Sequence, residues 1–508
     1  MQDALIALAQ RLARVEVSPI AQPIQSRVAY VLSHAPTYAS NGYAVRTQGI
    51  AQALQSAGLE VIGLVRTGRP WSLAADADIP VEQRVSGVRY LHSRQPSDYH
   101  IDSEAYLEAA VERYVTLLRI YRPSAVLAAS NWIVSLPAWA AAKRLGLPFH
   151  HEVRGFWELS RAAREPAYEE TEAFRQASAR DTFVARQAER VFTLNGPMRD
   201  RLIDDGVEAD RIDLVPNGLA ALPKALDPDP ALRERLGIAA DERVVGYIGS
   251  FSPYEGLDVL LEACTELVQG GEKLKLLLVG DNQPLIGASA ADVANTGLKD
   301  TPPWLIQVGR VPHEQVADYY ALLDAVVIPR KPLAVCNIVP PMKAAEALAY
   351  GKRLVVSDVA PLAEYAQKHE SVVAFEAGNA GSLATALQRS LKLPAPKPST
   401  ELLFSAHTEP MVRALKGEEG QQGGESEPVA KLEAEPITTT ESLIELAQRL
   451  VKEKQAPLTP TAGRVAVVAS QPWRANQPGY AQRVQQLASQ LQANDWEALC
   501  MVGPFGTA

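Results

Sequence analysis

The sequence is poor in cysteine, in positive charge and in long apolar runs, and each shortage excludes a class of protein. Only three cysteines occur in 508 residues, with neither a disulfide pattern nor metal-ligand spacing, which fits a reducing compartment. The net charge of −9 argues against nucleic acid as a partner. No charged-then-apolar leader opens the chain, and the most apolar window, residues 125–142, is interrupted by polar residues and Pro137. We therefore expect a cytoplasmic protein without a transmembrane segment.

The sequence does contain a long alternation of apolar strands and helices. Residues 27–32, 43–57 and 60–65 indicate a strand, a helix and a second strand, which is the opening unit of a doubly wound domain. A second series of the same kind begins at residue 243 and ends with a helix over residues 381–391. We predict an α/β protein with two doubly wound, Rossmann-like domains whose carboxyl edges face a central cleft, where a ligand would bind.

Changes in composition give the expected boundaries. Residues 222–230 are rich in proline, and residues 394–440 combine proline with glycine and glutamate, as in a flexible linker. The predicted organisation is a helix and linker (1–26), a first domain (27–221), a second domain (222–393), a flexible linker (394–440) and a partial repeat (441–508).

The last segment repeats the first. Residues 443–450 (LIELAQRL) echo residues 5–12 (LIALAQRL), and residues 464–470 echo the first strand at residues 27–33. The copy stops after one β-α-β unit, which leaves most of its apolar surface uncovered. We hypothesise a fragment of a tandem protein or a product that lost its second unit. A native mass ending at Ala508 would rule out the fragment.

Residues 330–357 form the stretch around which the second domain is organised. An apolar run ends at Pro329, a loop rich in proline and small residues follows, and a helix is expected over residues 342–349 before a buried strand. Such a loop and helix start present free N–H groups and a positive helix end, which suit a phosphate. Glu346, on the first turns of this helix, could accept hydrogen bonds from two sugar hydroxyls or could be a solvated helix glutamate.

Several short motifs occur together in the order of a known family. They are GYAVRT (42–47), HEVRGFW (151–157), VPNG (215–218), YIGSF (247–251) with YEGLD (254–258), VGD (279–281), VGRVP (308–312) and PPMKAAEALAYG (340–351). With them the sequence resembles the GT-B glycosyltransferases of family 4, which are retaining enzymes that use nucleotide-sugar donors. The resemblance covers residues 27–391.

The resemblance implies roles for matching residues around the donor. Gly42 would let the first loop approach the donor, and Gly249 and Ser250 would contact its diphosphate. Glu346 would bind the nucleotide ribose. The further donor-binding positions that the motifs imply are Asp281, Arg310, Arg330 and Lys343.

Two positions depart from the family pattern. A basic residue often follows the Gly249 loop, but Glu255 stands in that neighbourhood, so the charge would have to come from Arg330, Lys331 or Lys343. The first acid of the paired-glutamate motif should lie eight residues before Glu346, where this chain has Ile338. This second departure places sugar recognition or catalysis in question.

The candidate catalytic residues are His151 and Arg154, at the carboxyl end of a first-domain strand and expected to face the cleft. Arg154 has the fork of donors that suits a phosphate or carboxylate, although a salt bridge with Glu152 or Glu158 is the alternative. His151 could orient a sugar hydroxyl or could be a packing residue.

The implied reaction is transfer of a sugar with retention, in which helix ends and cations stabilise the leaving diphosphate without a metal or cofactor. The acceptor would be a glycan, a lipid-linked sugar or a small molecule, and peripheral membrane contact stays open. A nucleotide-sugar epimerase and a degenerate sugar-nucleotide-binding module are the alternatives. A dehydrogenase is disfavoured because GxGxxG follows neither first strand.

Overall fold

The computed structural model describes residues 3–39, 41–72, 78–94, 100–224, 227–280, 301–418, 464–468 and 497–501. It divides into one compact unit over residues 1–421 and a second over residues 422–508. No described helix is both long enough and apolar enough to cross a membrane.

The first unit begins with a sheet of eight strands in the order β3-β4-β2-β1-β5-β6-β7-β8, parallel throughout except for the β3–β4 hairpin. The two strands of this hairpin, of four residues each, were not expected from the sequence. The order reverses beside β1, which lies between β2 and β5, so a ligand crevice is expected at the carboxyl end of β1. The strands are β1 (Ile24–Leu32), β2 (Glu60–Val65), β3 (Glu82–Val85), β4 (Val88–Leu91), β5 (Pro123–Ala129), β6 (Phe149–Glu152), β7 (Arg190–Thr193) and β8 (Ile212–Leu214).

Both faces of this sheet are covered, because alternate residues of each strand point to opposite sides. Ala29 and Val31 of β1 belong to the apolar cluster beneath one set of helices, whereas Tyr30 and Leu32 belong to a cluster on the opposite face. The helices of this half are α1 (Ala4–Ala13), α2 (Gly42–Ser56), α3 (Glu104–Tyr121), α4 (Trp132–Arg144), α5 (Trp157–Ala162), α6 (Glu172–Gln187) and α7 (Gly196–Asp204).

The second sheet has six parallel strands in the order β11-β10-β9-β12-β13-β14, with its reversal beside β9. The carboxyl end of β9 is therefore the expected ligand crevice of this half. Its strands are β9 (Arg243–Ile248), β10 (Leu274–Val279), β11 (Leu305–Val308), β12 (Ala325–Ile328), β13 (Arg353–Ser357) and β14 (Val372–Phe375). Its helices are α8 (Pro230–Arg235), α9 (Leu257–Gln269), α11 (Val316–Leu322), α12 (Ala334–Ile338), α13 (Lys343–Ala349), α14 (Ala360–Lys368) and α15 (Ala380–Ser390).

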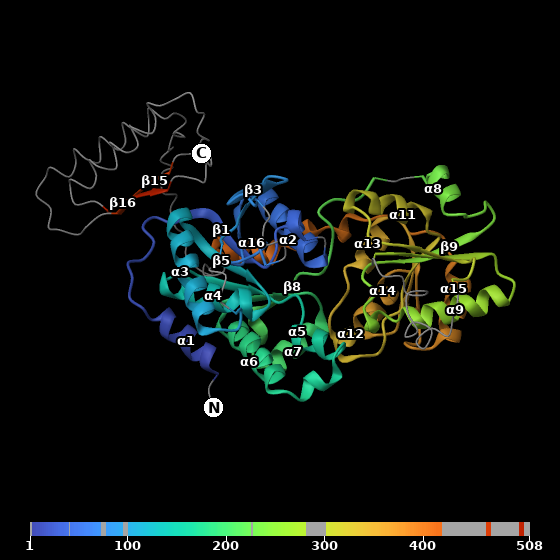
Figure 1. Cartoon of the computed structure of the whole chain (residues 1–508), viewed down its shortest axis with the longest axis horizontal. Coiled ribbons are helices and arrows are strands. Elements are labelled where there is room, and N and C mark those ends of the chain that lie inside the picture. The colour runs from blue at the N-terminus through green and yellow to red at the C-terminus, as the bar shows by residue number, and fades with distance from the viewer. Residues whose placement is uncertain are drawn as a thin grey trace, which may run out of the picture. The chain divides into compact units, whose positions relative to one another are not determined.

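The short helix α12 lies within the loop that was expected to be irregular, and it joins the two halves. It contacts α5 and α7 of the first half (Figure 1). Its residues Val335 and Cys336 belong to the same apolar cluster as Phe156 and Leu159.

The predicted flexible linker is wrong for its first part. After α15 the chain forms two short 3-10 helices, Thr400–Leu402 and Phe404–Ala406, and then α16 (Glu409–Lys416). Phe404 is fully buried, and it packs with Met411 and Leu415 on the first sheet, where α16 contacts β1 and β5. Figure 1 shows the orange α16 among the blue and cyan elements of the first half. The apolar positions of α16 lie in a segment whose composition resembles a linker, so composition alone missed them.

The second unit is described only for β15 (Arg464–Val468) and β16 (Glu497–Met501), which pair in parallel. Two parallel strands agree with the β-α-β unit expected there. The tandem-copy hypothesis itself stays a prediction.

Candidate functional site

Two glycines create a bare backbone surface at the carboxyl ends of β9 and β10. Gly249 has φ 150° and Gly280 has φ 147°. A Cβ added to Gly280 would lie 2.0 Å from the Gly249 carbonyl oxygen, so no larger residue fits. Ser250 follows Gly249 and is exposed, while its carbonyl accepts a hydrogen bond of 2.7 Å from the Tyr247 hydroxyl. The loop predicted to approach a diphosphate therefore has no side chain of its own at Gly249.

Lys343 lies directly against this loop. A Cβ added to Gly249 would lie 2.2 Å from Lys343 Cε, and the Lys343 ammonium sits 5.0 Å from the centre of the Tyr247 ring. Because α13 begins at Lys343, a cation, the start of a helix and the glycine loop come together here. The structure thus brings together Gly249, Ser250 and Lys343, and their predicted contact with a diphosphate stays a prediction.

The acidic departure Glu255 is buried between two of the predicted phosphate-binding cations. Its carboxylate accepts hydrogen bonds from Arg330 Nη2 at 3.0 Å, from Arg330 Nε at 3.3 Å and from Lys343 Nζ at 3.2 Å. Burial alone would raise the pKa of Glu255, but Arg330 and Lys343 outweigh it and lower that pKa to about 2. Arg330 also donates to the Val339 carbonyl at 2.9 Å. Arg330 is therefore engaged inside the protein and does not face an open phosphate site.

Glu346 is half-buried on the first turn of α13, where one carboxylate oxygen lies 3.4 Å from the Tyr320 hydroxyl. Tyr320 stacks on Tyr350 with ring centroids 4.3 Å apart. This stacking holds the Tyr320 hydroxyl in place beside the Glu346 carboxylate. Arg310 is exposed shortly after β11, the edge strand of the sheet. Asp281 lies outside the described residues.

Gly42 brings the first half up to the second. It starts α2, whose Asn41 cap accepts a hydrogen bond from Ala44 N, and a Cβ at Gly42 would lie 3.2 Å from Met342 Cγ. Gly42 therefore comes close to Met342, the residue that precedes α13, while the predicted approach of its loop to a donor stays a prediction.

The loop that carries Ile338 is docked on the first half. Asn195 Nδ2 donates to the Ile338 carbonyl at 3.1 Å, and Asn217 Nδ2 donates to the Pro340 carbonyl at 3.2 Å. The Ile338 side chain packs against the main apolar cluster. At the position of the missing acid the chain therefore has an apolar contact. The sequence analysis noted Asn217 only as part of the VPNG motif and did not single out Asn195.

Arg154 is buried in a network centred on Glu152. Arg154 Nη2 lies 2.6 Å from one Glu152 carboxylate oxygen, and Arg46 Nε lies 2.8 Å from the other. The Tyr30 hydroxyl donates to Glu152 as well. Burial would raise the pKa of Glu152, but the two guanidinium groups and the hydrogen bonds lower it to about 2. The structure realises the salt-bridge alternative for Arg154, contrary to the prediction that it faces the cleft.

The network reaches the start of α2. Arg154 Nη1 donates to Thr47 Oγ1 at 2.7 Å and to the Tyr43 carbonyl at 3.2 Å. Arg46 donates to the carbonyls of Val215 and Pro216 at 2.8 and 2.9 Å. The sequence analysis did not single out Arg46. An arginine among the small residues of α2 could have indicated a buried charge that needs a partner.

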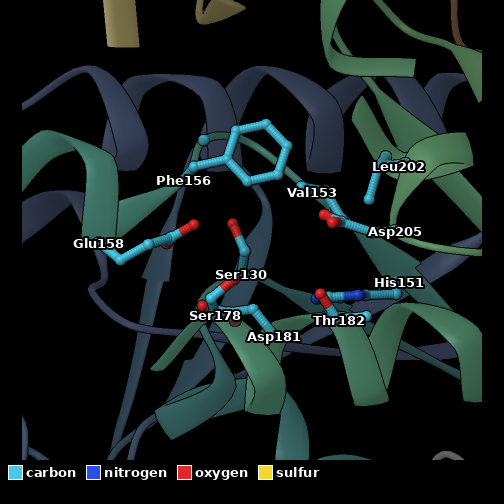
Figure 2. Close-up of a pocket in the computed structure, with 11 residues that line it drawn as sticks. Ser130, His151, Val153, Phe156, Glu158, Ser178, Asp181, Thr182, Leu202 and Asp205 are labelled. Atoms are coloured by element: carbon cyan, nitrogen blue, oxygen red, sulfur yellow. The ribbon is translucent and has the colours of Figure 1, made fainter. Parts of the chain in front are cut away.

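His151 points into an internal cavity of about 10 Å³, which is room for roughly one water molecule (Figure 2). The side chain is only 1% exposed, and neither ring nitrogen has a hydrogen-bond partner. Burial lowers the pKa of His151 to about 3, so the ring is neutral near pH 7. The prediction that His151 faces the cleft is therefore wrong, because its strand turns this side chain towards α6.

The same cavity is lined by carboxyl groups, including Glu158 and Asp181. Burial raises the pKa of Glu158, and burial followed by the nearby Glu158 raises the pKa of Asp181 well above its usual range. A cavity of this size cannot hold a sugar. Among the described residues, no group of three or more His, Cys, Asp or Glu side chains could hold a metal ion.

Comparison with known families agrees with this architecture. Residues 41–218 match the model of the glycosyl transferase 4-like domain, and residues 242–392 match that of the glycosyl transferases group 1. The two matches together cover more than half of the chain and fall on its two sheets. The chain therefore belongs to the GT-B glycosyltransferases of family 4.

Curated relatives match only in part. The lipopolysaccharide 1,2-N-acetylglucosaminetransferase of Salmonella typhimurium is 30% identical over 32% of this chain and 42% of its own length. A D-inositol 3-phosphate glycosyltransferase of Xylanimonas cellulosilytica is 26% identical over 46% of this chain and 55% of its own. The chain thus spans about half the length of the curated relatives it matches.

Solved structures share the fold. A sucrose-phosphate synthase from Thermosynechococcus elongatus aligns with a TM-score of 0.54 at 19% identity, over 85% of this chain and all of its own (100%). The catalytic domain of starch synthase IV from Arabidopsis thaliana, bound to ADP and acarbose, aligns with a TM-score of 0.53 at 15% identity, over 77% of this chain and 94% of its own. At these identities the likeness establishes the fold alone.

Proposed function

We propose that this protein transfers a sugar from a nucleotide-sugar donor to an acceptor hydroxyl, with the donor's diphosphate bound at the carboxyl end of β9. The observation that carries the proposal is the meeting of Lys343, the start of α13 and the bare Gly249–Gly280 backbone. The N–H groups of Gly249 and Gly280 donate to the carbonyls of Val279 at 2.8 Å and Val308 at 3.3 Å, so they are already used. The groups that we propose to bind the phosphate are the N–H groups at the start of α13 and the Lys343 ammonium, which need no metal.

Glu346 supports a nucleotide as the ligand. It lies one turn beyond Lys343 on α13. There its carboxylate can accept hydrogen bonds from ribose hydroxyls while the Lys343 ammonium binds the phosphates. The spacing of one helical turn places both side chains on the same face of α13. We propose that these two residues bind the two ends of one nucleotide diphosphate.

In the reaction that we propose, the bond between the anomeric carbon and the diphosphate oxygen breaks, and the diphosphate takes the bonding electrons. Lys343 and the surrounding N–H groups stabilise the departing charge. The acceptor hydroxyl attacks the same face of the oxocarbenium-like sugar and loses its proton to the leaving phosphate, so the configuration is retained. This route needs no acid at the position of Ile338 for departure of the leaving group.

We assign Arg154 a positioning role. It reaches no acceptor or donor atom in this proposal, but it holds the Tyr43 carbonyl and the Thr47 hydroxyl at the start of α2. Since Gly42 of that turn approaches Met342, Arg154 sets how closely the acceptor half approaches the donor loop. The acceptor would be a glycan, a lipid-linked sugar or a small molecule.

The proposal is tested by calorimetric titration of the protein with UDP, GDP and ADP, repeated on Glu346→Ala. We expect one nucleotide to bind and its affinity to fall at least tenfold in the variant, because the ribose loses its acceptor. Glu370→Ala, which removes an exposed carboxylate of the same half, is the matched control and should bind as the wild type does.

Failure of all three nucleotides to bind would overturn the proposal. If one binds, the cognate nucleotide-sugar is incubated with and without acceptors. Product that appears without an acceptor would identify an epimerase or hydrolase, and binding without any turnover would identify a sugar-nucleotide-binding module.

A further inference from the structure

Three arginines gather at the carboxyl edge of the first sheet, away from the network around Glu152. Arg66 follows the last residue of β2, and its N–H donates to the Leu32 carbonyl at the end of β1 at 2.8 Å. The next turn folds back, since Arg69 N donates to the Arg66 carbonyl at 2.9 Å. Arg94, which follows β4, lies over the Trp71 ring at 5.0 Å from its centre. The strands β1, β2 and β4 are parallel neighbours, so all three arginines project from one edge.

Among the residues that the structure describes, Arg66 is buried and Arg69 is half-buried, and both have buried nitrogens without hydrogen-bond partners, whereas Arg94 is exposed. Arg66 is only 7% exposed and its Nε has no hydrogen-bond acceptor. Arg69 Nε and Nη1 are buried and equally unpartnered, as is the Trp71 indole N–H. Neither Arg66 nor Arg69 is ion-paired with a carboxylate in the part of the chain that the structure describes. Buried donors without acceptors are rare and costly, so each needs an explanation.

The contrast with Arg46 in the same half shows what a structural arginine looks like here. Arg46 is 2% exposed and donates to Glu152, Asn217 and the carbonyls of Val215 and Pro216. Every nitrogen of its guanidinium group is used. Arg66 is nearly as enclosed as Arg46 and Arg69 is half-buried, yet both have unused donors, which is the pattern of a site built for a ligand.

Among the residues that the structure describes, no carboxylate is ion-paired with Arg66 or Arg69, and the pKa shifts in the cluster agree with this. Burial, followed by the adjacent Arg66, lowers the pKa of Arg69. Burial, followed by Arg69 and Arg66, lowers the pKa of His34, which follows β1, to about 4. Positive charges therefore lie close together at this edge of the sheet, and a bound negative group would relieve the repulsion.

We propose that Arg66 and Arg69, with the Trp71 indole N–H, bind an oxyanion, a phosphate or carboxylate group carried by the acceptor substrate. The assignment of this oxyanion to the acceptor rests on the proposed function, in which the donor's diphosphate occupies the second half. The guanidinium fork suits both oxyanions because two parallel N–H groups match two oxygens. The carboxyl edge beside the β1 switch point is where this fold class binds ligands.

The test titrates the full-length protein with inorganic phosphate and, separately, with sodium acetate, while melting temperature and heat of binding are followed. We compare the wild type with Arg69→Gln, the charge-conserving Arg69→Lys and the control Arg175→Gln, which removes an exposed arginine of α6. Lys343→Ala is included because phosphate can also bind at the donor loop.

We expect phosphate or acetate to raise the melting temperature of the wild type, of Arg175→Gln and of Lys343→Ala. In Arg69→Gln the affinity should fall at least tenfold, with an intermediate loss in Arg69→Lys. Without anion, Arg69→Gln should melt no lower than the wild type, because it removes an unpaired charge. The anion that binds more tightly identifies the oxyanion.

An equal response of Arg69→Gln and wild type to both anions would overturn the proposal, as would the absence of any response. A melting temperature of Arg69→Gln far below that of the wild type without anion would also overturn it, because it would show a structural arginine. Nucleotide titrations of the same variants keep the two proposals separate: nucleotide binding that survives in Arg69→Gln leaves the donor site intact whatever the anion result.

Discussion

Glu255 occupies the place where a cation would strengthen a phosphate site, and it neutralises part of the charge that is present. Its carboxylate lies 3.0 Å from Arg330 Nη2 and 3.2 Å from Lys343 Nζ. In the donor site that we propose, a diphosphate at Gly249 would compete with this built-in anion for Lys343. The departure at this residue should weaken donor binding without changing the fold.

We predict that Glu255→Gln increases the affinity for the cognate nucleoside diphosphate on the order of tenfold, because Lys343 is released from a buried carboxylate at short range. Calorimetric titration of the wild type and the variant measures the change. Asp258→Asn is the control, since it breaks the more exposed Lys331 pair at 2.6 Å and should have little effect. Weaker binding in Glu255→Gln would instead mean that Glu255 holds the two cations in their binding positions.

At the scale of elements, the return of the chain to the first half after α15 is the main addition to the predicted architecture. Phe404 inserts between α2 and the first sheet, where a Cβ added to Gly49 would lie 2.3 Å from its ring. Gly49 on α2 is therefore required by a segment far along the chain. The 3-10 helices and α16 belong to the first unit and not to a linker.

We predict that Phe404→Ala lowers the free energy of unfolding by about 3–5 kcal/mol, because a fully buried aromatic ring leaves a cavity. Urea titration followed by circular dichroism measures the loss. Leu214→Ala, at a leucine that is 40% exposed on β8, is the control and should cost much less. A loss in Phe404→Ala no larger than that of the control would show that residues 399–417 are not part of the core.

For the molecule as a whole, the most consequential interior charge is Glu152, which joins β1, α2, β6 and the segment after β8. Its pKa of about 2 in the folded protein lies below the ordinary value of 4.5. A depressed carboxyl pKa contributes stability that is present above pH 4.5 and is lost as the pH falls towards 2.

We predict that Glu152→Gln destabilises the protein by about 3 kcal/mol at pH 7, since it leaves Arg46 and Arg154 buried without their anion. The difference between wild type and variant should shrink as the pH falls from about 5 towards 2, where Glu152 itself becomes protonated. Denaturant titrations across this pH range measure the difference in unfolding free energy between wild type and variant. Glu158 and Asp181, whose raised pKa values have the opposite effect on stability, are present in both proteins, so their contributions cancel in this difference. Glu172→Gln, in an exposed pair with Arg175, should change little at any pH. A difference that does not vary with pH would contradict the ionised state of Glu152.

The sequence by itself determined what depends on local spacing. The alternation of apolar strands with helices predicted two doubly wound halves, and the comparisons confirmed the GT-B fold. The glycines of the β9 and β10 loops could be noticed because a close backbone approach excludes side chains. Such a requirement is visible in the sequence as a glycine at one position. Glu346 was predicted from the expected start of a helix and the PPMKAAEALAYG motif, and Lys343 as one of three candidate cations; their roles at a donor stay predictions.

Only the tertiary structure decided which charges meet. Arg330 and Glu255 are 75 positions apart in the sequence, and Arg46 and Glu152 are 106 positions apart. No local sequence pattern could therefore predict either ion pair. The same holds for the burial of His151, which depends on the face of β6 that α6 covers, and for Phe404, whose partner helix lies near the other end of the chain. The sequence gives the charge of each side chain, but the partner and the exposure of that side chain depend on packing between distant segments.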